Sequence, residues 1–365
     1  MSIAEDLAPE FGGGQTRGAS EYSTEQIVGD GRWFPLRFNR DTDEFQFAFI
    51  PPECHRETPF LIHVEPPASE TRMIARSATS AVDVEKAPLH FILHEGFGGS
   101  TLLGKLLGQP GVAIPLQEPP ILTDIAAACA SAAADAQTMR LQQDATRLLS
   151  RPISPGEAII CKSTHLGNGL ASTMAAFQPT SQILCLQTPL EEMLMSLVLR
   201  GLPGRISARK IFISLRNSNM GISQLAGMDA LTDRHLAHDT DLELAALAWL
   251  SMQRMMVETA SRLGPERVRS ISTRQFMKDP GATLRVAARH LRLPLDVDRQ
   301  LTGGLLDRHS KTGEPFNPER RAERFAEGLR FHRSEIAPVV KWARTIAERT
   351  GTAWELPYPL LEAPA

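Results

Sequence analysis

One short segment, residues 89–107, constrains the fold of this 365-residue chain more than any other. It begins with an apolar run, residues 89–93, which favours a buried strand. A glycine-rich turn comes next, and an apolar stretch after it favours a helix. The turn and the first helical residues are Gly96, Gly98, Gly99, Ser100 and Thr101. Glycine allows a backbone with positive φ, and a helix start exposes N–H donors at the positive end of its dipole. The segment therefore predicts a strand, turn and helix that bind an anion such as phosphate.

The turn differs from the loop of ordinary nucleoside triphosphatases. That loop reads G-x-x-x-x-G-K-[ST], with the lysine on the outer phosphates and the hydroxyl on magnesium. Here Ser100 stands where the lysine is required, and Lys105 follows only one helical turn later. No candidate strand ends in an aspartate that would hold a metal ion. The pattern favours an anion without a metal over a magnesium nucleotide.

Apolar strands and apolar helices alternate from Pro88 onward, which is typical of parallel βαβ units. The predicted strands are residues 90–93, 158–161, 182–186 and 268–271. The predicted helices are residues 100–107, 138–149, 190–199, 242–263 and 280–291. We therefore expect an α/β fold with a doubly wound, mostly parallel sheet. Ligands of such sheets lie at the carboxyl ends of the strands.

For the segments outside this alternating pattern, the predictions rest on amino-acid composition and local hydrophobic patterns. Residues 1–22 are expected to be disordered, and residues 23–86 to form a small β-rich module with strands at 32–38 and 45–50. Residues 60–64 fit a third strand or a short buried segment, and a polar linker is expected near 77–83. The aromatic residues of this module favour a core, although they could also form a lid over the anion site. The main domain is expected at 87–350 and a C-terminal tail at 351–365, with a packed helix at 125–134, a polar irregular cap at 201–238 and a charged helix at 318–328.

Composition excludes several classes of protein. Hydrophobic residues make up 42% of the chain, enough for one large core, and the net charge of −3 provides no basic field for nucleic acid. The four cysteines have no C-x-x-C spacing, and Cys161 and Cys185 lie inside apolar strands, which favours buried free thiols. We expect neither a signal peptide nor a membrane span, since no uncharged apolar run reaches the roughly 20 residues required. A soluble, cytoplasmic protein is expected.

The glycine turn, with Glu118-Pro119 beyond it, resembles the phosphosulfate-binding loop of PAPS-dependent sulfotransferases, in particular their bacterial and protein-tyrosine branches. The resemblance extends over about residues 87–345. Lys162 closes a second apolar strand as the family's lysine does, residues 183–196 are similar to its strand–"RDP"–helix segment, and residues 268–293 are similar to a segment near its end. The resemblance implies a P-loop sulfotransferase fold. It also implies transfer of a sulfuryl group from PAPS (3′-phosphoadenosine 5′-phosphosulfate) to a hydroxyl of a small molecule, saccharide or peptide, with no metal.

The resemblance assigns roles residue by residue. Glu118 corresponds to the general base and Lys162 to the cation that stabilises the transferred group, with His94 as a possible substitute for a missing base or cation. His165, which follows Lys162, has a similar claim. The expected donor-binding residues are Gly96, Gly98, Gly99, Ser100, Thr101, Gln187, Ser196, Arg200 and Lys311. Structural alternatives stay open: Glu118 could cap a helix, Lys162 could be a surface lysine, and Ser100 and Thr101 could be ordinary helix caps.

Two departures from the family pattern leave the activity open. Phe97 stands where the family has a catalytic Arg or Lys, and Gln187 stands where it has the arginine for the 3′-phosphate. Each loses a charge-assisted bond, which is roughly twice as strong as a neutral one. The alternatives are a non-catalytic anion or nucleotide binder and, less favoured, a P-loop kinase for a small molecule. If the protein is an active sulfotransferase, another cation has to replace the one missing at Phe97. The first candidate is Lys162, followed by Arg200 and His94.

Overall fold

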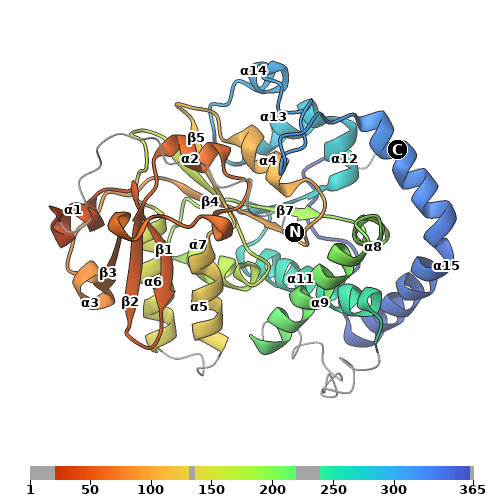
Figure 1. The fold of residues 1–365 in the computed structure, drawn as a ribbon, viewed down its shortest axis with the longest axis horizontal. Coiled ribbons are helices and arrows are strands. Elements are labelled where there is room, and N and C mark those ends of the chain that lie inside the picture. Colours follow the sequence, from red (N-terminus) through yellow and green to blue (C-terminus); the bar gives the residue numbers. More distant parts are fainter. Residues whose placement is uncertain (1–20, 131–135, 219–238, 362–365) are drawn as a thin grey trace.

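The computed structural model describes residues 21–130, 136–218 and 239–361, and almost all of the predicted disordered segment falls outside these ranges. At its centre lies a five-stranded parallel sheet with the strand order β5-β6-β4-β7-β8 (Figure 1). These strands are β4 (Leu89–His94), β5 (Ala113–Gln117), β6 (Ala158–Lys162), β7 (Ile183–Gln187) and β8 (Val268–Ser272). The expected α/β class with a parallel sheet is confirmed, and β4 takes a central position.

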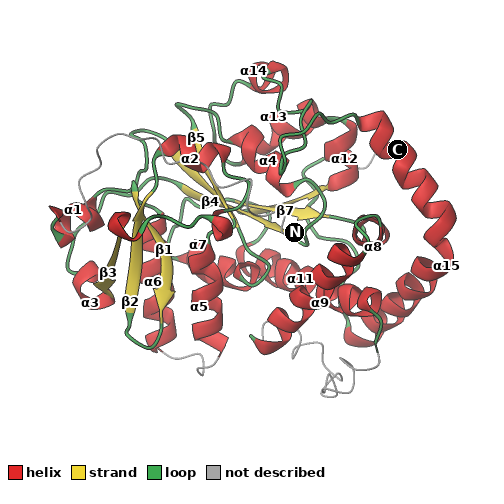
Figure 2. Ribbon diagram, viewed as in Figure 1, coloured by secondary structure: helices red, strands yellow, loops and turns green. Residues whose placement is uncertain are grey.

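Helices cover both faces of this sheet (Figure 2). Along β4, Phe91 belongs to the core on one face and Ile92 to the core on the other, as the alternation of side chains in a strand requires. The core that contains Ile92 includes α4 (Ser100–Leu107), α12 (Thr273–Lys278), α13 (Pro280–His290) and α14 (Val297–Thr302). The core that contains Phe91 includes α5 (Pro120–Ala130), α6 (Ala136–Leu149), α7 (Ala171–Ala176), α8 (Leu190–Val198), α9 (Leu202–Asn217), α11 (Asp241–Leu263) and α15 (Pro318–Thr350).

The N-terminal region forms the expected small β-rich unit beside this layered domain. Its antiparallel sheet has the strand order β1-β2-β3. Phe45 and Phe47, two residues apart on β2, are both buried on one face of this sheet. Its elements are α1 (Thr24–Gly29), β1 (Trp33–Asn39), β2 (Glu44–Phe49), α2 (Pro52–Glu57), β3 (Thr71–Ala75) and α3 (Arg76–Ser80). Its apolar side chains belong to the same core as Phe91, so the small sheet is built into the larger domain.

Two expectations for the N-terminal unit need correction. Of the two alternatives for residues 60–64, the third strand is wrong: Leu61–His63 is a short 3-10 helix that buries Leu61, and the third strand is β3. Part of the polar linker expected near 77–83 is helical, since α3 ends at Ser80. Arg76, its first residue, pairs with Asp43 at 2.8 Å and with Asp144 of α6 at 3.1 Å, which holds the helix against the main domain.

Three further expectations were wrong or incomplete in the main domain. Strand β5 was missed because it contains Pro115, which cannot donate to a ladder; it is tolerated because β5 is an edge strand. The cap expected at 201–238 is helical over α9, which buries Ala208, Phe212 and Leu215 on one face; residues 219–238 lie outside the described ranges. The helix expected at 318–328 continues to Thr350.

Other helices agree with expectation at their described residues. Helix α5 covers the described part of the helix expected at 125–134, whose last residues lie outside the described ranges. Cys161 and Cys185 are buried free thiols, as predicted from their strands. Within the described ranges, no helix combines the length and apolar character that crossing a bilayer demands.

Candidate functional site

The glycine turn lies at the carboxyl end of the central strand β4 and leads directly into α4. Gly96 and Gly99 have φ values of 93° and 90°, and Phe97 between them has a φ of 60°. A Cβ on Gly98 would lie 1.9 Å from Oγ1 of Thr188, so this position has no room for a side chain. Positive φ values therefore favour glycine at residues 96 and 99, and close packing against Thr188, the residue after β7, requires glycine at residue 98.

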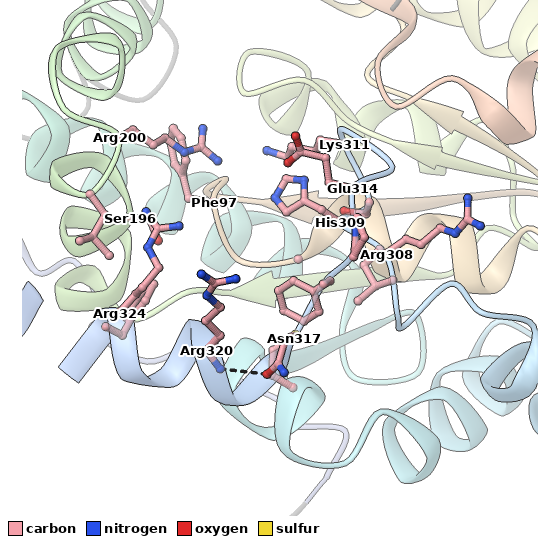
Figure 3. A pocket seen from close by; sticks show the side chains of 18 of the residues that line it. Phe97, Ser196, Arg200, Arg308, His309, Lys311, Glu314, Asn317, Arg320 and Arg324 are labelled. Atoms are coloured by element: carbon pink, nitrogen blue, oxygen red, sulfur yellow. Dashed lines mark hydrogen bonds between the residues drawn. The ribbon is translucent and has the colours of Figure 1, made fainter. Parts of the chain in front are cut away.

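A cavity of about 810 Å³ opens in front of this turn (Figure 3). The turn and α4 supply one wall, the end of α8 supplies a second, and the loop before α15 with the first turns of α15 supplies the rest. The lining residues used below are Phe97, Gly99, Ser100, Ser196, Arg200, Arg308, Lys311, Glu314, Arg320 and Arg324. The cavity thus joins segments more than 200 residues apart in the chain, from Phe97 to Arg324.

The cavity is strongly positive. Among its described lining residues, five are cationic and one, Glu314, is a carboxylate. Within the described residues, none of those five forms an ion pair, whereas salt bridges are common elsewhere on the surface. Figure 3 shows Arg200, Lys311, Arg320 and Arg324 arranged around the hollow. Unpaired cations facing one cavity favour a ligand with several negative charges.

A buried ion pair lies behind the turn. The Lys162 ammonium, 1% exposed, is 2.5 Å from Oε1 of Glu118, and it also donates to Oγ1 of Thr101 at 3.1 Å. Burial tends to raise the pKa of Glu118, but Lys162 and two neighbouring imidazoles lower it to about 2. Glu118 is therefore a carboxylate at neutral pH and, while Lys162 holds it, a weak base. Lys162 is not a surface lysine.

Two histidines adjoin this pair. The rings of His94 and His165 meet edge to face at 5.5 Å, and Nε2 of His94 lies 3.0 Å from the Ser163 carbonyl and 3.8 Å from Glu118. Burial lowers the pKa of both imidazoles, so both are neutral at pH 7. Nδ1 of His94 and Nε2 of His165 have no hydrogen-bond partner among the described residues. For His165, the position three residues after Lys162 was the available signal in the sequence.

Aromatic rings alternate with cations between the buried pair and the cavity. The Phe60 ring lies 4.9 Å from Nζ of Lys162 and 5.1 Å from Nζ of Lys311. The Phe97 ring lies 5.7 Å from Nζ of Lys311 and 4.8 Å from the Arg200 guanidinium. Phe60 belongs to the N-terminal unit, which therefore reaches the site. Sequence reasoning allowed a lid here but did not identify Phe60.

The predicted donor residues divide into three groups. Gly99, Ser100, Ser196, Arg200 and Lys311 line the cavity, and Gly96, Gly98 and Thr101 belong to the turn beside it. Gln187 is not among the lining residues: its Nε2 donates to the Trp354 carbonyl at 2.8 Å, and its Oε1 accepts from the Leu356 N–H at 3.4 Å. Both ends of the amide thus hold the C-terminal segment. Residues 358–360 of that segment pair with Ser270 of β8.

Glu95, directly before the turn, is a buried carboxyl without a cationic partner. Its Oε2 accepts from the Thr188 N–H at 3.0 Å, and its Oε1 has no partner among the described residues. Burial raises the pKa of Glu95 to about 8. The side chain is therefore a neutral acid at pH 7, and it ties the end of β4 to the residue after β7.

This state predicts a pH dependence of stability. Because the folded pKa of about 8 lies above the ordinary value of 4.5, Glu95 contributes stability below pH 4.5 that is lost as pH rises towards 8. The loss has a slope of up to about 1.4 kcal/mol per pH unit. Glu95→Gln should remove this pH dependence, so the free energy of unfolding of the variant should rise relative to that of the wild type as pH increases. Urea unfolding at several pH values measures this; Glu355→Gln, an exposed neighbour, is the control, and parallel curves for wild type and Glu95→Gln would contradict the prediction.

Several solved structures are similar to this chain, among them three sulfotransferases or sulfotransferase domains. A sulfotransferase domain from the curacin biosynthetic pathway aligns with a TM-score of 0.41 over 75% of this chain and 100% of its own. A sulfotransferase from Alicyclobacillus acidocaldarius gives 0.36 over 70% and 97%, and a sulfotransferase domain from the Synechococcus PCC 7002 olefin synthase gives 0.33 over 65% and 84%. Each is 16% identical to this chain. No family model and no curated protein matches, so the residues of the site have to carry the functional conclusion.

Proposed function

We propose that the cavity binds PAPS and that the protein transfers the sulfuryl group of PAPS to a hydroxyl acceptor. One observation carries the proposal: five cations without ion pairs to described residues line a cavity in front of a glycine turn at the end of the central strand. A buried lysine–carboxylate pair lies directly behind that turn. A nucleotide with phosphates at both ends and a reactive anhydride matches this combination of a wide positive cavity and an adjoining acid–base pair.

The proposed donor site divides by element. The backbone N–H groups of Gly99 and Ser100, at the start of α4, suit the 5′-phosphate. Ser196 and Arg200, on and just after α8, suit the 3′-phosphate, because Gln187 is occupied by the C-terminal segment. Arg200 is exposed, but its guanidinium packs on the Phe97 ring at 4.8 Å, which orients it at the edge of the cavity. Arg200 thereby takes the role that the family pattern would give to residue 187.

The proton transfer depends on the Lys162–Glu118 pair. In the proposed reaction, the acceptor oxygen bonds to sulfur, the sulfur–oxygen bond to the nucleotide breaks, and the electron pair stays on the departing phosphate. We infer that Lys162 then turns its hydrogen bonds from Glu118 towards this new negative charge. Losing that cation raises the pKa of Glu118, which takes the acceptor's proton. His94 and His165, both neutral and each with a ring nitrogen that has no partner among the described residues, are further proton acceptors beside the pair.

The other candidate functions fit less well. A P-loop kinase would require a lysine in place of Ser100, and none of the five described parallel strands ends in aspartate. A non-catalytic nucleotide binder is favoured by Phe97 alone, since this residue leaves the turn itself without a cation. The buried pair behind the turn favours an enzyme.

The test is stabilisation by nucleotide. Adenosine 3′,5′-bisphosphate at about 100 times its Kd should raise the free energy of unfolding by about 2.7 kcal/mol, whereas ATP with magnesium should have much less effect. Arg200→Met should weaken the bisphosphate, and Lys105→Met, outside the cavity, is the matched control. Stronger stabilisation by magnesium ATP would favour the kinase, and no stabilisation by either nucleotide would end the proposal.

A further inference from the structure

The turn lacks its own cation, yet a cation lies beside the residue that replaces it. Nζ of Lys311 is 5.7 Å from the centre of the Phe97 ring and 5.1 Å from that of Phe60. Lys311 comes from the loop before α15, more than 200 residues further along the chain. A lysine between two aromatic faces is attracted by both, and the attraction grows when water is excluded.

The charged neighbours of Lys311 place it on the reacting side of the site. The groups that act on its ammonium are Arg200, Lys162 and Glu118, and the ammonium in turn acts on His165. Three of these four belong to the buried cluster behind the turn. By contrast, no cation–π contact of Arg320 or Arg324 with either ring is found among the described residues, and Arg200 contacts only the Phe97 ring, at 4.8 Å. Among the described cations of the cavity, Lys311 is therefore the one that contacts both rings.

The loop that carries Lys311 is held by its own backbone. The N–H of His309 donates to the Glu314 carbonyl at 2.7 Å, and the N–H of Gly313 donates back to the His309 carbonyl at 2.8 Å. The N–H of Phe316 donates to the Asp307 carbonyl at 2.7 Å. These bonds close a tight turn around Lys311, so its side chain starts from a fixed point and the two rings fix its end.

We propose that Lys311 supplies, from the C-terminal loop, the cation that the glycine turn lacks at Phe97. On this reading, which rests on the proposed function, the Lys311 ammonium binds the sulfuryl end of PAPS and donates to the bridging oxygen. That oxygen keeps the electron pair when its bond to sulfur breaks and leaves as part of the bisphosphate. Phe97 and Phe60 are positioning residues that hold the ammonium there.

Binding of two nucleotides tests this without knowledge of the acceptor. PAPS and adenosine 3′,5′-bisphosphate share both phosphate positions and differ in the sulfuryl group, so a loss confined to PAPS reports a contact with that group. Calorimetry on Lys311→Met should show PAPS weakened roughly tenfold to a hundredfold more than the bisphosphate, the range for a lost charge-assisted bond. Arg324→Met, which removes a cation from the same cavity, should weaken both nucleotides alike.

A second readout follows from the charge of Lys311. Burial, with Arg200 and Lys162, lowers the pKa of Lys311 to about 8, against the opposite effect of Glu118. The wild-type preference for PAPS over the bisphosphate should therefore decline as pH rises through about 8, and in Lys311→Arg it should persist to higher pH. A double variant, Phe97→Lys with Lys311→Met, should regain the preference because the ammonium returns to the same place.

The outcomes separate the two proposals. Equal weakening of both nucleotides by Lys311→Met, or a preference that does not change with pH, would make Lys311 an ordinary phosphate cation and overturn this inference while leaving the proposed function intact. A wild type that binds neither nucleotide would overturn the proposed function first. A double variant that binds the bisphosphate normally but shows no preference for PAPS would also count against the inference.

Discussion

Replacing Lys162 by methionine should lower the free energy of unfolding at pH 7 by about 3–5 kcal/mol, the range for breaking one side of a buried ion pair. The ammonium is 1% exposed and bonds Glu118 at 2.5 Å and Thr101 at 3.1 Å. Methionine fills the space, but it leaves the buried Glu118 carboxyl without its ion-pair partner. Urea unfolding measures the loss, which therefore reports the uncompensated charge more than the missing packing.

The double variant Lys162→Met with Glu118→Gln is the control. Removing both charges together should recover at least half of the loss, because such pairs contribute little net stability compared with apolar replacements. Additive losses in the two single variants would contradict a direct coupling. Acid gives a second check. The folded pKa of about 2 lies below the ordinary 4.5, so the stability that Glu118 contributes above pH 4.5 should be lost between pH 4.5 and 2, and Glu118→Gln should lack this loss.

Local signals predicted the centre of the fold well. The run that forms β4 is short, apolar and followed by glycines, and each of these properties depends only on neighbouring residues. Helix α4 begins and ends where the sequence placed it, at Ser100 and Leu107. Because the carboxyl ends of parallel strands meet at one edge, Lys162 could be expected close to the glycine turn, and its ammonium bonds Oγ1 of Thr101 at 3.1 Å.

The structural predictions failed at residues whose role depends on packing against parts of the chain that are distant in sequence. Gly328 reads as a helix end, but a Cβ there would lie 2.7 Å from Sδ of Met195, so this glycine lets α15 approach α8 closely. Pro115 reads as a strand breaker and is harmless on an edge strand. The resemblance predicts that Gln187, at the end of β7, binds a phosphate. Instead, both polar atoms of its side-chain amide form hydrogen bonds with the C-terminal segment. None of these partners lies nearby in the sequence.

The candidate site shows the same division. Ser196, Arg200 and Lys311 were expected near the donor, and all three line one cavity. Phe60 could not have been expected, since its contacts with Lys162 and Lys311 join the N-terminal unit to residues over 100 and 250 positions away. The contacts between these rings and cations follow no periodic pattern in the sequence. They form because residues from separate segments of the chain, around residues 60, 97, 200 and 311, come together in the fold.

The N-terminal unit is held to the domain by a buried arginine, and its loss should be as costly as that of Lys162. Arg151 is 1% exposed and makes no ion pair within the described ranges; instead its guanidinium caps the end of α1 and the start of β1. It donates to the carbonyl oxygens of Ile27, Val28, Asp30, Trp33 and Leu148. Burial lowers the pKa of Arg151 to about 9 despite the opposite effect of Asp30, yet the group stays charged at pH 7.

Arg151→Met should lower the free energy of unfolding by about 4–6 kcal/mol, because several buried carbonyls lose their donor at about 1–3 kcal/mol each. Arg151→Lys should lose roughly half as much, since one ammonium cannot reach as many carbonyls as a planar guanidinium. Arg147→Met, which removes bonds to only the Val82 and Thr79 carbonyls, is the control and should cost less. Calorimetry measures all three variants. A loss below about 1 kcal/mol in Arg151→Met would mean that the shared apolar core alone holds the unit, and Phe60 would then keep its place over Lys162 without the arginine.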